Sequence, residues 1–99
     1  MELPVHIDKE QIAQFCRKHL IVRLALFGSV LTERFSEESD VDVLVEFDPA
    51  HIPGMIRLCG MERELSAVIG RKVDMRTPND LSRYFRDEVL STAVVQYVA

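Results

Sequence analysis

The sequence lacks the features of nucleic-acid-binding and membrane proteins. Its 99 residues carry a formal net charge of −4, and they contain no basic cluster with interleaved aromatic residues. Because sequence-independent binding to nucleic acid needs a basic surface, we expect no direct nucleic-acid binding. No segment approaches the roughly 20 apolar residues of a membrane span, so we also expect no membrane partner.

Cysteine is scarce, and a secretion signal is not visible. Cys16 and Cys59 do not have the spacing of a metal site. The first residues, Met-Glu-Leu-Pro, lack the basic region and the apolar run of a signal peptide. We therefore predict reduced cysteines and a cytoplasmic protein.

The overall composition is that of an ordinary globular domain. Hydrophobic residues make up 47% of the chain and charged residues 28%. The length suits one compact core, and no repeat, low-complexity tract or interdomain linker interrupts the sequence. We therefore expect a single domain over residues 1–99.

Hydrophobic periodicity and turn residues predict alternating helices and strands. A first helix should begin after Asp8 and end near His19, and Gly70 should end a later one. The predicted strands cover residues 21–27, 41–47 and 72–76, and the other predicted helices cover 30–35, 55–69 and 81–97. Thr77-Pro78 introduces the last helix, with an apolar stripe of Leu81, Phe85, Val89, Leu90, Ala93, Val94 and Tyr97.

This alternation predicts an α/β fold with a small mixed β-sheet flanked by helices. The first two strands should be antiparallel, so that the end of one lies beside the start of the next. The second and third are separated by a helix, which favours a parallel pair with a right-handed crossover.

Small and acidic residues are placed where these strands should meet. Gly28 and Ser29 follow the first strand, and such a turn offers backbone N–H groups to a phosphate. Asp40 and Asp42 lie two positions apart, which places them on one face of the second strand. Two carboxylates without a nearby Cys or His suit a hard cation such as Mg²⁺. The parallel crossover brings Asp74 to the same end of the sheet.

This pattern resembles the minimal nucleotidyltransferases of the DNA polymerase β superfamily, in particular the small antitoxin-like group that partners helical HEPN proteins. The resemblance rests on Leu26–Ser29, Ser39–Val45 and Lys72–Met75. It implies a palm-like fold in which Gly28 and Ser29 hold a nucleotide triphosphate. It also implies that Asp40, Asp42 and Asp74 are catalytic residues and metal ligands for two Mg²⁺ ions, and that Asp74 helps to activate the acceptor hydroxyl.

The resemblance further implies that AMP is transferred from ATP to a tyrosine hydroxyl of a HEPN-type toxin. A chain this short has little space for an acceptor-binding domain, so a partner or a second copy should present the acceptor. Two alternatives stay open: an inactive nucleotide-binding antitoxin that acts only by binding its partner, and transfer to a small molecule such as an aminoglycoside.

One stretch departs from the family pattern. After Gly-Ser, members commonly continue with basic and small residues, whereas this chain has Val30-Leu31-Thr32-Glu33. A cation for the triphosphate would therefore have to come from elsewhere. The candidates near these motifs are Arg34, Arg71 and Lys72.

Overall fold

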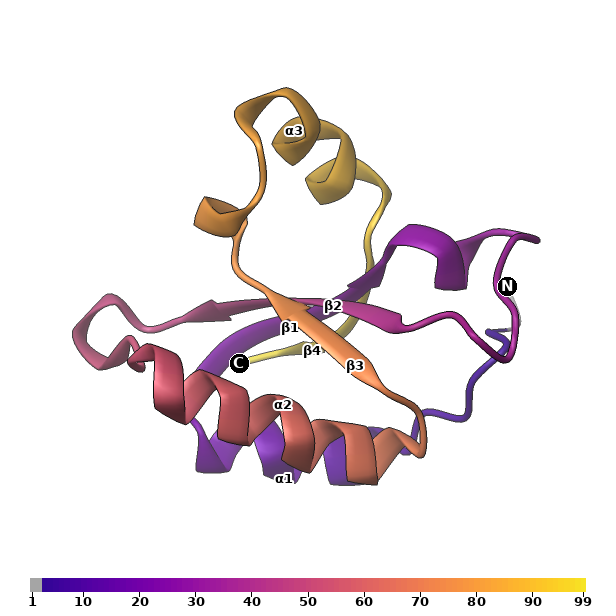
Figure 1. Cartoon of the computed structure of the whole chain (residues 1–99). Coiled ribbons are helices and arrows are strands. Elements are labelled where there is room, and N and C mark those ends of the chain that lie inside the picture. Colours follow the sequence, from indigo (N-terminus) through magenta and orange to yellow (C-terminus); the bar gives the residue numbers. More distant parts are fainter. Residues whose placement is uncertain (1–2) are drawn as a thin grey trace.

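The computed structural model describes residues 3–99 (Figure 1). Its helices and strands are α1 (Lys9–Lys18), β1 (Ile21–Phe27), β2 (Val41–Phe47), α2 (Met55–Ile69), β3 (Val73–Arg76), α3 (Arg83–Thr92) and β4 (Val94–Val98). Short 3₁₀-helices cover Gly28–Leu31, Pro49–His51 and Pro78–Asp80. Within this described part, no helix combines the length and the apolar character needed to cross a membrane.

The four strands form one mixed sheet in the order β3-β2-β1-β4. β1 is antiparallel to both β2 and β4, whereas β2 and β3 are parallel. The predicted antiparallel and parallel pairs are therefore confirmed, and so is the mixed α/β fold class.

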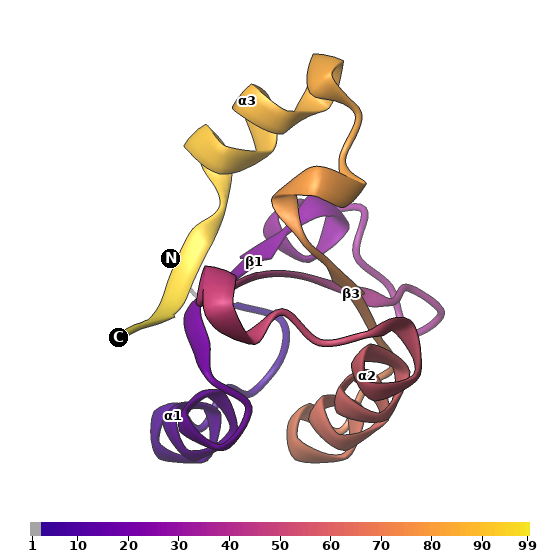
Figure 2. The same cartoon turned by 90° about the vertical axis from the view of Figure 1, so that its left-hand side faces the viewer.

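The helices lie on opposite sides of this sheet. α1 and α2 cover one face, and α3 stands apart on the other side (Figures 1 and 2). Alternate residues of β2 point toward α1 and α2, and Val41, Val43 and Val45 are fully buried in the hydrophobic core there. Asp42 lies between them in sequence and therefore belongs to the face toward α3.

Capping residues set the helix boundaries as the sequence predicts. The Asp8 side chain accepts hydrogen bonds from the backbone N–H groups of Glu10 and Gln11, at 3.0 and 3.2 Å. At the end of α2, Gly70 adopts a left-handed conformation with φ of 80°. Both helix positions are confirmed.

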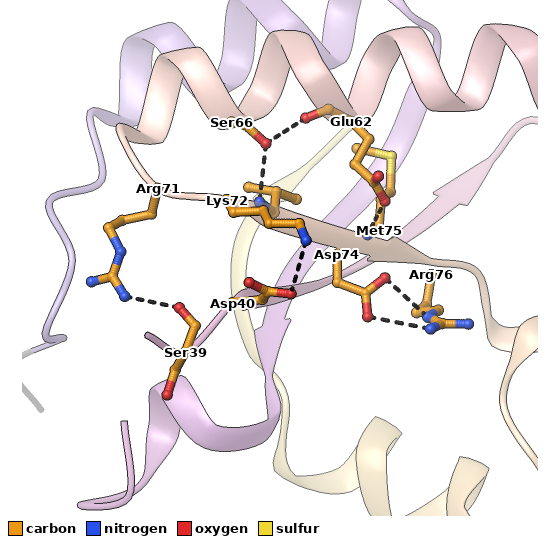
Figure 3. Close-up of polar contacts among 10 residues, drawn as sticks. Ser39, Asp40, Glu62, Ser66, Arg71, Lys72, Asp74, Met75 and Arg76 are labelled. Atoms are coloured by element: carbon orange, nitrogen blue, oxygen red, sulfur yellow. Dashed lines mark hydrogen bonds and ion pairs between the residues drawn. The ribbon is translucent and has the colours of Figure 1, made fainter. Parts of the chain in front are cut away.

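Side chains of α2 cover the outer edge of β3 (Figure 3). The Val73 N–H donates to Ser66 Oγ at 3.0 Å, and the Met75 N–H donates to Glu62 Oε2 at 2.8 Å. The edge amides of this strand therefore have partners without another strand beside them.

The helix predicted over residues 30–35 is wrong in position and type. The structure has a 3₁₀-helix over Gly28–Leu31 instead, which starts at the glycine itself. Thr32 ends it in an extended conformation, and its N–H and its hydroxyl both donate to the Ser29 carbonyl at 2.9 Å. These two bonds complete the turn and prevent its continuation as an α-helix.

The helix predicted over residues 81–97 is also wrong at its C-terminal end. α3 stops at Thr92, and Val94–Val98 forms β4, which pairs with β1. β-branched and aromatic residues favour a strand in this last segment, and the open edge of β1 supplies its hydrogen-bond partners. No residue of α3 is fully buried, so the part of the predicted stripe that lies in α3 is not core-facing, whereas Tyr97 on β4 packs against the core.

Candidate active site

The Gly28-Ser29 corner packs directly on the carboxylate of Asp42. Gly28 has a φ of 77°, a conformation that residues with a Cβ rarely adopt. A Cβ at this position would collide with an Asp42 carboxylate oxygen and lie 3.1 Å from Cγ of the same side chain. The glycine is therefore required both by its backbone angle and by its closeness to the acid.

The strand register brings the three predicted acids into one neighbourhood. Asp42 lies opposite Phe27 in the antiparallel pair, beside the corner, and opposite Asp74 in the parallel pair. Asp40 precedes Asp42 by two residues, directly before β2 begins. The Gly-Ser corner and the acids thus meet at one end of the sheet, on the face toward α3.

Burial and neighbouring charges both change the pKa of Asp42. Burial raises the pKa of Asp42 above its usual value, and the nearby carboxylates of Asp74 and Asp40 raise it further. The guanidinium of Arg76 acts in the opposite direction. Ionised Asp42 is therefore less favourable in the folded chain than in the unfolded chain.

Two basic side chains provide positive charge to the other acids (Figure 3). Arg76 holds both carboxylate oxygens of Asp74, with Nε 3.2 Å from Oδ1 and Nη2 3.3 Å from Oδ2. Lys72 Nζ lies 3.9 Å from Asp40 Oδ2. The carboxylates of Asp74 and Asp40 are thus turned toward separate cations.

The donor chemistry fits a hard divalent cation, although the side chains are not gathered around one point. Within residues 3–99, no three His, Cys, Asp or Glu side chains are arranged as a ready-made metal cage. The acids are nevertheless close enough to raise the pKa of Asp42. Carboxylate oxygens, without sulfur or imidazole, are the ligands preferred by Mg²⁺. The donor chemistry of these residues therefore fits the ion.

A cleft of about 960 Å³ opens between the corner and α3. Gly28 and Ser29 line one wall, and apolar side chains that include Leu81, Phe85 and Val89 line the opposite wall. The cleft combines the backbone of the Gly28-Ser29 corner, basic side chains and an apolar wall, whereas Asp40, Asp42 and Asp74 lie beside it and are not among its lining residues. This combination can accept a ligand that has both a phosphate chain and an apolar ring.

Comparison with known proteins decides the family. Residues 9–96, which include every predicted site residue, match the nucleotidyltransferase domain family. The chain belongs to this family.

This nucleotidyltransferase domain is similar to a protein assigned as an adenylyltransferase and to a solved minimal nucleotidyltransferase. A protein of Methanocaldococcus jannaschii that is assigned as a protein adenylyltransferase is 34% identical over 86 residues, which cover 87% of this chain and 90% of the relative. A solved structure described as a minimal nucleotidyltransferase has a TM-score of 0.72 and 29% identity, with 87% of this chain and 86% of the other covered. The predicted fold and family are therefore confirmed.

A further solved structure shows the same fold in a complex. It contains a tri-AMPylated HEPN toxin of Shewanella oneidensis bound to an MNT antitoxin. The TM-score is 0.66 at 18% identity, and the match covers 92% of this chain and 70% of the other. At this identity the similarity concerns the fold.

The departure after Gly28-Ser29 has a structural cause in this nucleotidyltransferase. Val30 is only 1% exposed and belongs to the hydrophobic core, so it anchors the corner to the body of the domain. A basic side chain at this position would have to be buried among apolar residues, which is costly.

Arg34, Arg71 and Lys72 are the residues predicted to replace the basic residue that is missing after Gly28-Ser29. The structure places these three side chains in different surroundings. Arg71 donates to the carbonyls of Ser36 and Ser39, each at 2.8 Å, and lies 4.6 Å over the ring of Phe35. It therefore holds the loop before Asp40. Lys72 pairs with Asp40 and does not line the cleft, whereas Arg34 does line it.

Sequence reasoning missed Arg76, the second basic residue that lines the cleft. Its signal was the spacing Asp74-x-Arg76 on a strand, which places both side chains on the same face. The spacing shows that the two side chains share a face, but it could not have shown that they form an ion pair or that Arg76 borders the cleft.

Proposed function

We propose that this chain is a Mg²⁺-dependent adenylyltransferase antitoxin that transfers AMP from ATP to a tyrosine hydroxyl of a helical HEPN-type toxin. Membership in the nucleotidyltransferase domain family supports the reaction class. The named adenylyltransferase relative and the complex of an AMPylated HEPN toxin with its antitoxin support the acceptor and the partner. We further propose that residues 1–99 act as one domain in the cytoplasm.

The observation that carries this proposal is the meeting of Gly28, Asp42 and Asp74 at one end of the sheet. The Gly28-Ser29 corner would hold the triphosphate through backbone N–H groups. Asp40, Asp42 and Asp74 would hold two Mg²⁺ ions, which would supply charge neutralisation for the transfer. The apolar wall with Phe85 would offer the nucleotide base an apolar surface to pack against.

In this reaction the acceptor hydroxyl oxygen forms a bond to the α-phosphorus of ATP. The bond between the α-phosphorus and the oxygen that bridges to the β-phosphorus breaks, and pyrophosphate leaves with that electron pair. The acceptor loses its proton, and Asp74 is the carboxylate that we assign to help with this loss. Positioning and charge neutralisation supply most of the rate in such transfers.

Transfer of label tests the proposal. The protein is incubated with α-³²P-labelled ATP, MgCl₂ and a purified HEPN-type protein as the candidate acceptor. We expect label on the partner, and we expect Asp42→Asn to reduce the rate by about 10²–10³-fold, the typical effect of removing an electrostatic stabiliser of the transition state. Asp8→Asn is the matched control, because asparagine caps α1 as well as aspartate does.

A binding-only antitoxin is the second candidate. The burial of Val30 favours it, because the corner itself then offers no cation to the triphosphate. Under this alternative, the partner would bind equally well to the wild type and to Asp42→Asn, and no label would be transferred by either. Equal partner binding together with label transfer by the wild type alone would support the enzyme instead.

A further inference from the structure

Arg76 contacts one of the site acids and also lines the cleft. Its guanidinium holds Asp74 through both carboxylate oxygens, and the same residue lines the cleft beside Gly28 and Ser29. Its side chain is 49% exposed, so it has space to move. No core side chain depends on its present position.

Two other basic groups of the neighbourhood, Arg71 and Lys72, are less suited than Arg76 to bind a phosphate in the cleft. Arg71 is bound to two backbone carbonyls and to an aromatic ring, and Lys72 lies beside Asp40 outside the cleft lining. Among the residues that line the cleft, Arg34 and Arg76 are the basic ones. Of these two, Arg76 is the one already bound to a site acid.

In this structure, an ion pair with Asp74 holds the guanidinium of Arg76 in place. Asp74 pairs with it directly, through both carboxylate oxygens. A divalent cation bound to the carboxylates would neutralise the negative charge that holds the arginine. The guanidinium would then lose its partner while it still borders the cleft. A planar guanidinium is well matched to phosphate oxygens.

We infer that Arg76 is the phosphate-binding cation of this site, and that a divalent cation releases it from Asp74 to the nucleotide. This assignment rests on the proposed nucleotidyltransferase function and adds to it a residue that replaces the missing basic side chain after Gly28-Ser29. Binding of the metal ion and of the nucleotide is then positively coupled through one side chain.

Binding measurements separate this role from a structural one. The full-length wild type, Arg76→Ala and Arg76→Lys are titrated by calorimetry, first with MgCl₂ alone and then with α,β-methylene-ATP in saturating MgCl₂. We expect Arg76→Ala to weaken nucleotide binding by about tenfold or more, the usual cost of a lost charged hydrogen bond. Mg²⁺ alone should bind this variant at least as tightly as the wild type, because its competitor for Asp74 is gone.

Two further variants control for charge and for location. Arg63→Ala removes the same charge from an exposed position of α2, and it should leave both affinities within about twofold. Arg34→Ala tests the other basic residue of the cleft and should cause a smaller loss of nucleotide affinity than Arg76→Ala. Arg76→Lys should recover part of the affinity, because lysine keeps the charge but not the planar fork.

Several results would overturn the assignment: nucleotide affinity of Arg76→Ala within twofold of the wild type, a joint loss of metal and nucleotide affinity, or a larger loss in Arg34→Ala. These metal and nucleotide affinities are measured without AMP transfer. A wild type that binds nucleotide through Arg76 but transfers no label would contradict the proposed function alone. A wild type that transfers label while Arg76→Ala binds nucleotide normally would contradict the Arg76 assignment alone.

Discussion

Neighbouring residues of β2 face opposite surroundings. Val41, Val43 and Val45 are buried against the layer of α1 and α2, whereas Asp42 lies on the face toward α3 beside Gly28 and Asp74. The first face is apolar and closed, and the second contains charges that repel one another. Stability and chemistry are therefore divided between these valines and Asp42 of the same strand, although Leu44, on the face of Asp42, is also buried.

The largest effect on stability should come from the closed face. Val43→Ala removes two methyl groups from a fully buried side chain, and we expect the free energy of unfolding to fall by about 2 kcal/mol. AMP transfer per folded molecule should change little. Urea unfolding and label transfer on the same sample measure both quantities, and a loss of transfer without a loss of stability would contradict the division of roles.

A smaller loss of stability should follow from Gly28→Ala at the boundary between the two faces. The new Cβ would be strained at a φ of 77° and would displace the Asp42 carboxylate, so we expect a cost of about 1–2 kcal/mol together with loss of transfer. Gly60→Ala is the control, because nothing lies within 4 Å of its Cβ position in the interior of α2. It should stabilise the protein by about 0.5–1 kcal/mol. Thermal melts of the two variants measure this: the melting temperature should fall for Gly28→Ala and rise for Gly60→Ala.

Asp42→Asn should have a modest effect on stability, and its sign should depend on pH and metal. A raised pKa means that the ionised carboxylate is less favourable in the folded than in the unfolded chain, so ionised Asp42 destabilises the fold at neutral pH. With EDTA present, the asparagine variant should melt at a higher temperature at pH 7. The difference should shrink as the pH falls toward the ordinary value of 3.8 and below, where both states are protonated.

The metal dependence provides the control for this experiment. Saturating MgCl₂ should raise the melting temperature of the wild type more than that of Asp42→Asn, because only the wild type keeps the full set of carboxylate ligands. An asparagine variant that melts below the wild type in EDTA at pH 7 would contradict the repulsion inferred among the acids.

The smallest effect should come from α3. Tyr84 is 79% exposed, and we expect Tyr84→Ala to change the free energy of unfolding by less than about 0.5 kcal/mol. Tyr97 on β4 packs against the hydrophobic core, so Tyr97→Ala should cost clearly more. Equal costs in chemical denaturation would mean that α3 is held to the sheet more firmly than its exposure indicates.

The strands next to the candidate site could be predicted from sequence because their signals agree. β1 and β2 have the predicted bounds, since apolar runs are delimited there by Gly28, Asp40 and Asp48. The closeness of Asp74 to Asp42 follows from one connectivity rule for parallel strands. The catalytic and metal-binding roles of these acids stay predictions.

The C-terminal segment could not be predicted in the same way. In Val94–Val98 the apolar residues fit both a helical stripe and a strand, and the outcome depends on the free edge of β1, which is a tertiary contact. The pairing of Arg76 with Asp74 depends on side-chain orientation, and the burial of Val30 depends on packing around the corner. Neither property is present in residue spacing alone.

The α2 side chains on β3 limit how this chain can associate with others. With Ser66 and Glu62 already bound to the amides of Val73 and Met75, that border of the sheet is a poor template for an incoming extended segment. Addition of a strand is therefore directed to β4, at the other end of the sheet order. An oligomer or fibre built through backbone pairing would consequently leave Asp74 and its surroundings accessible.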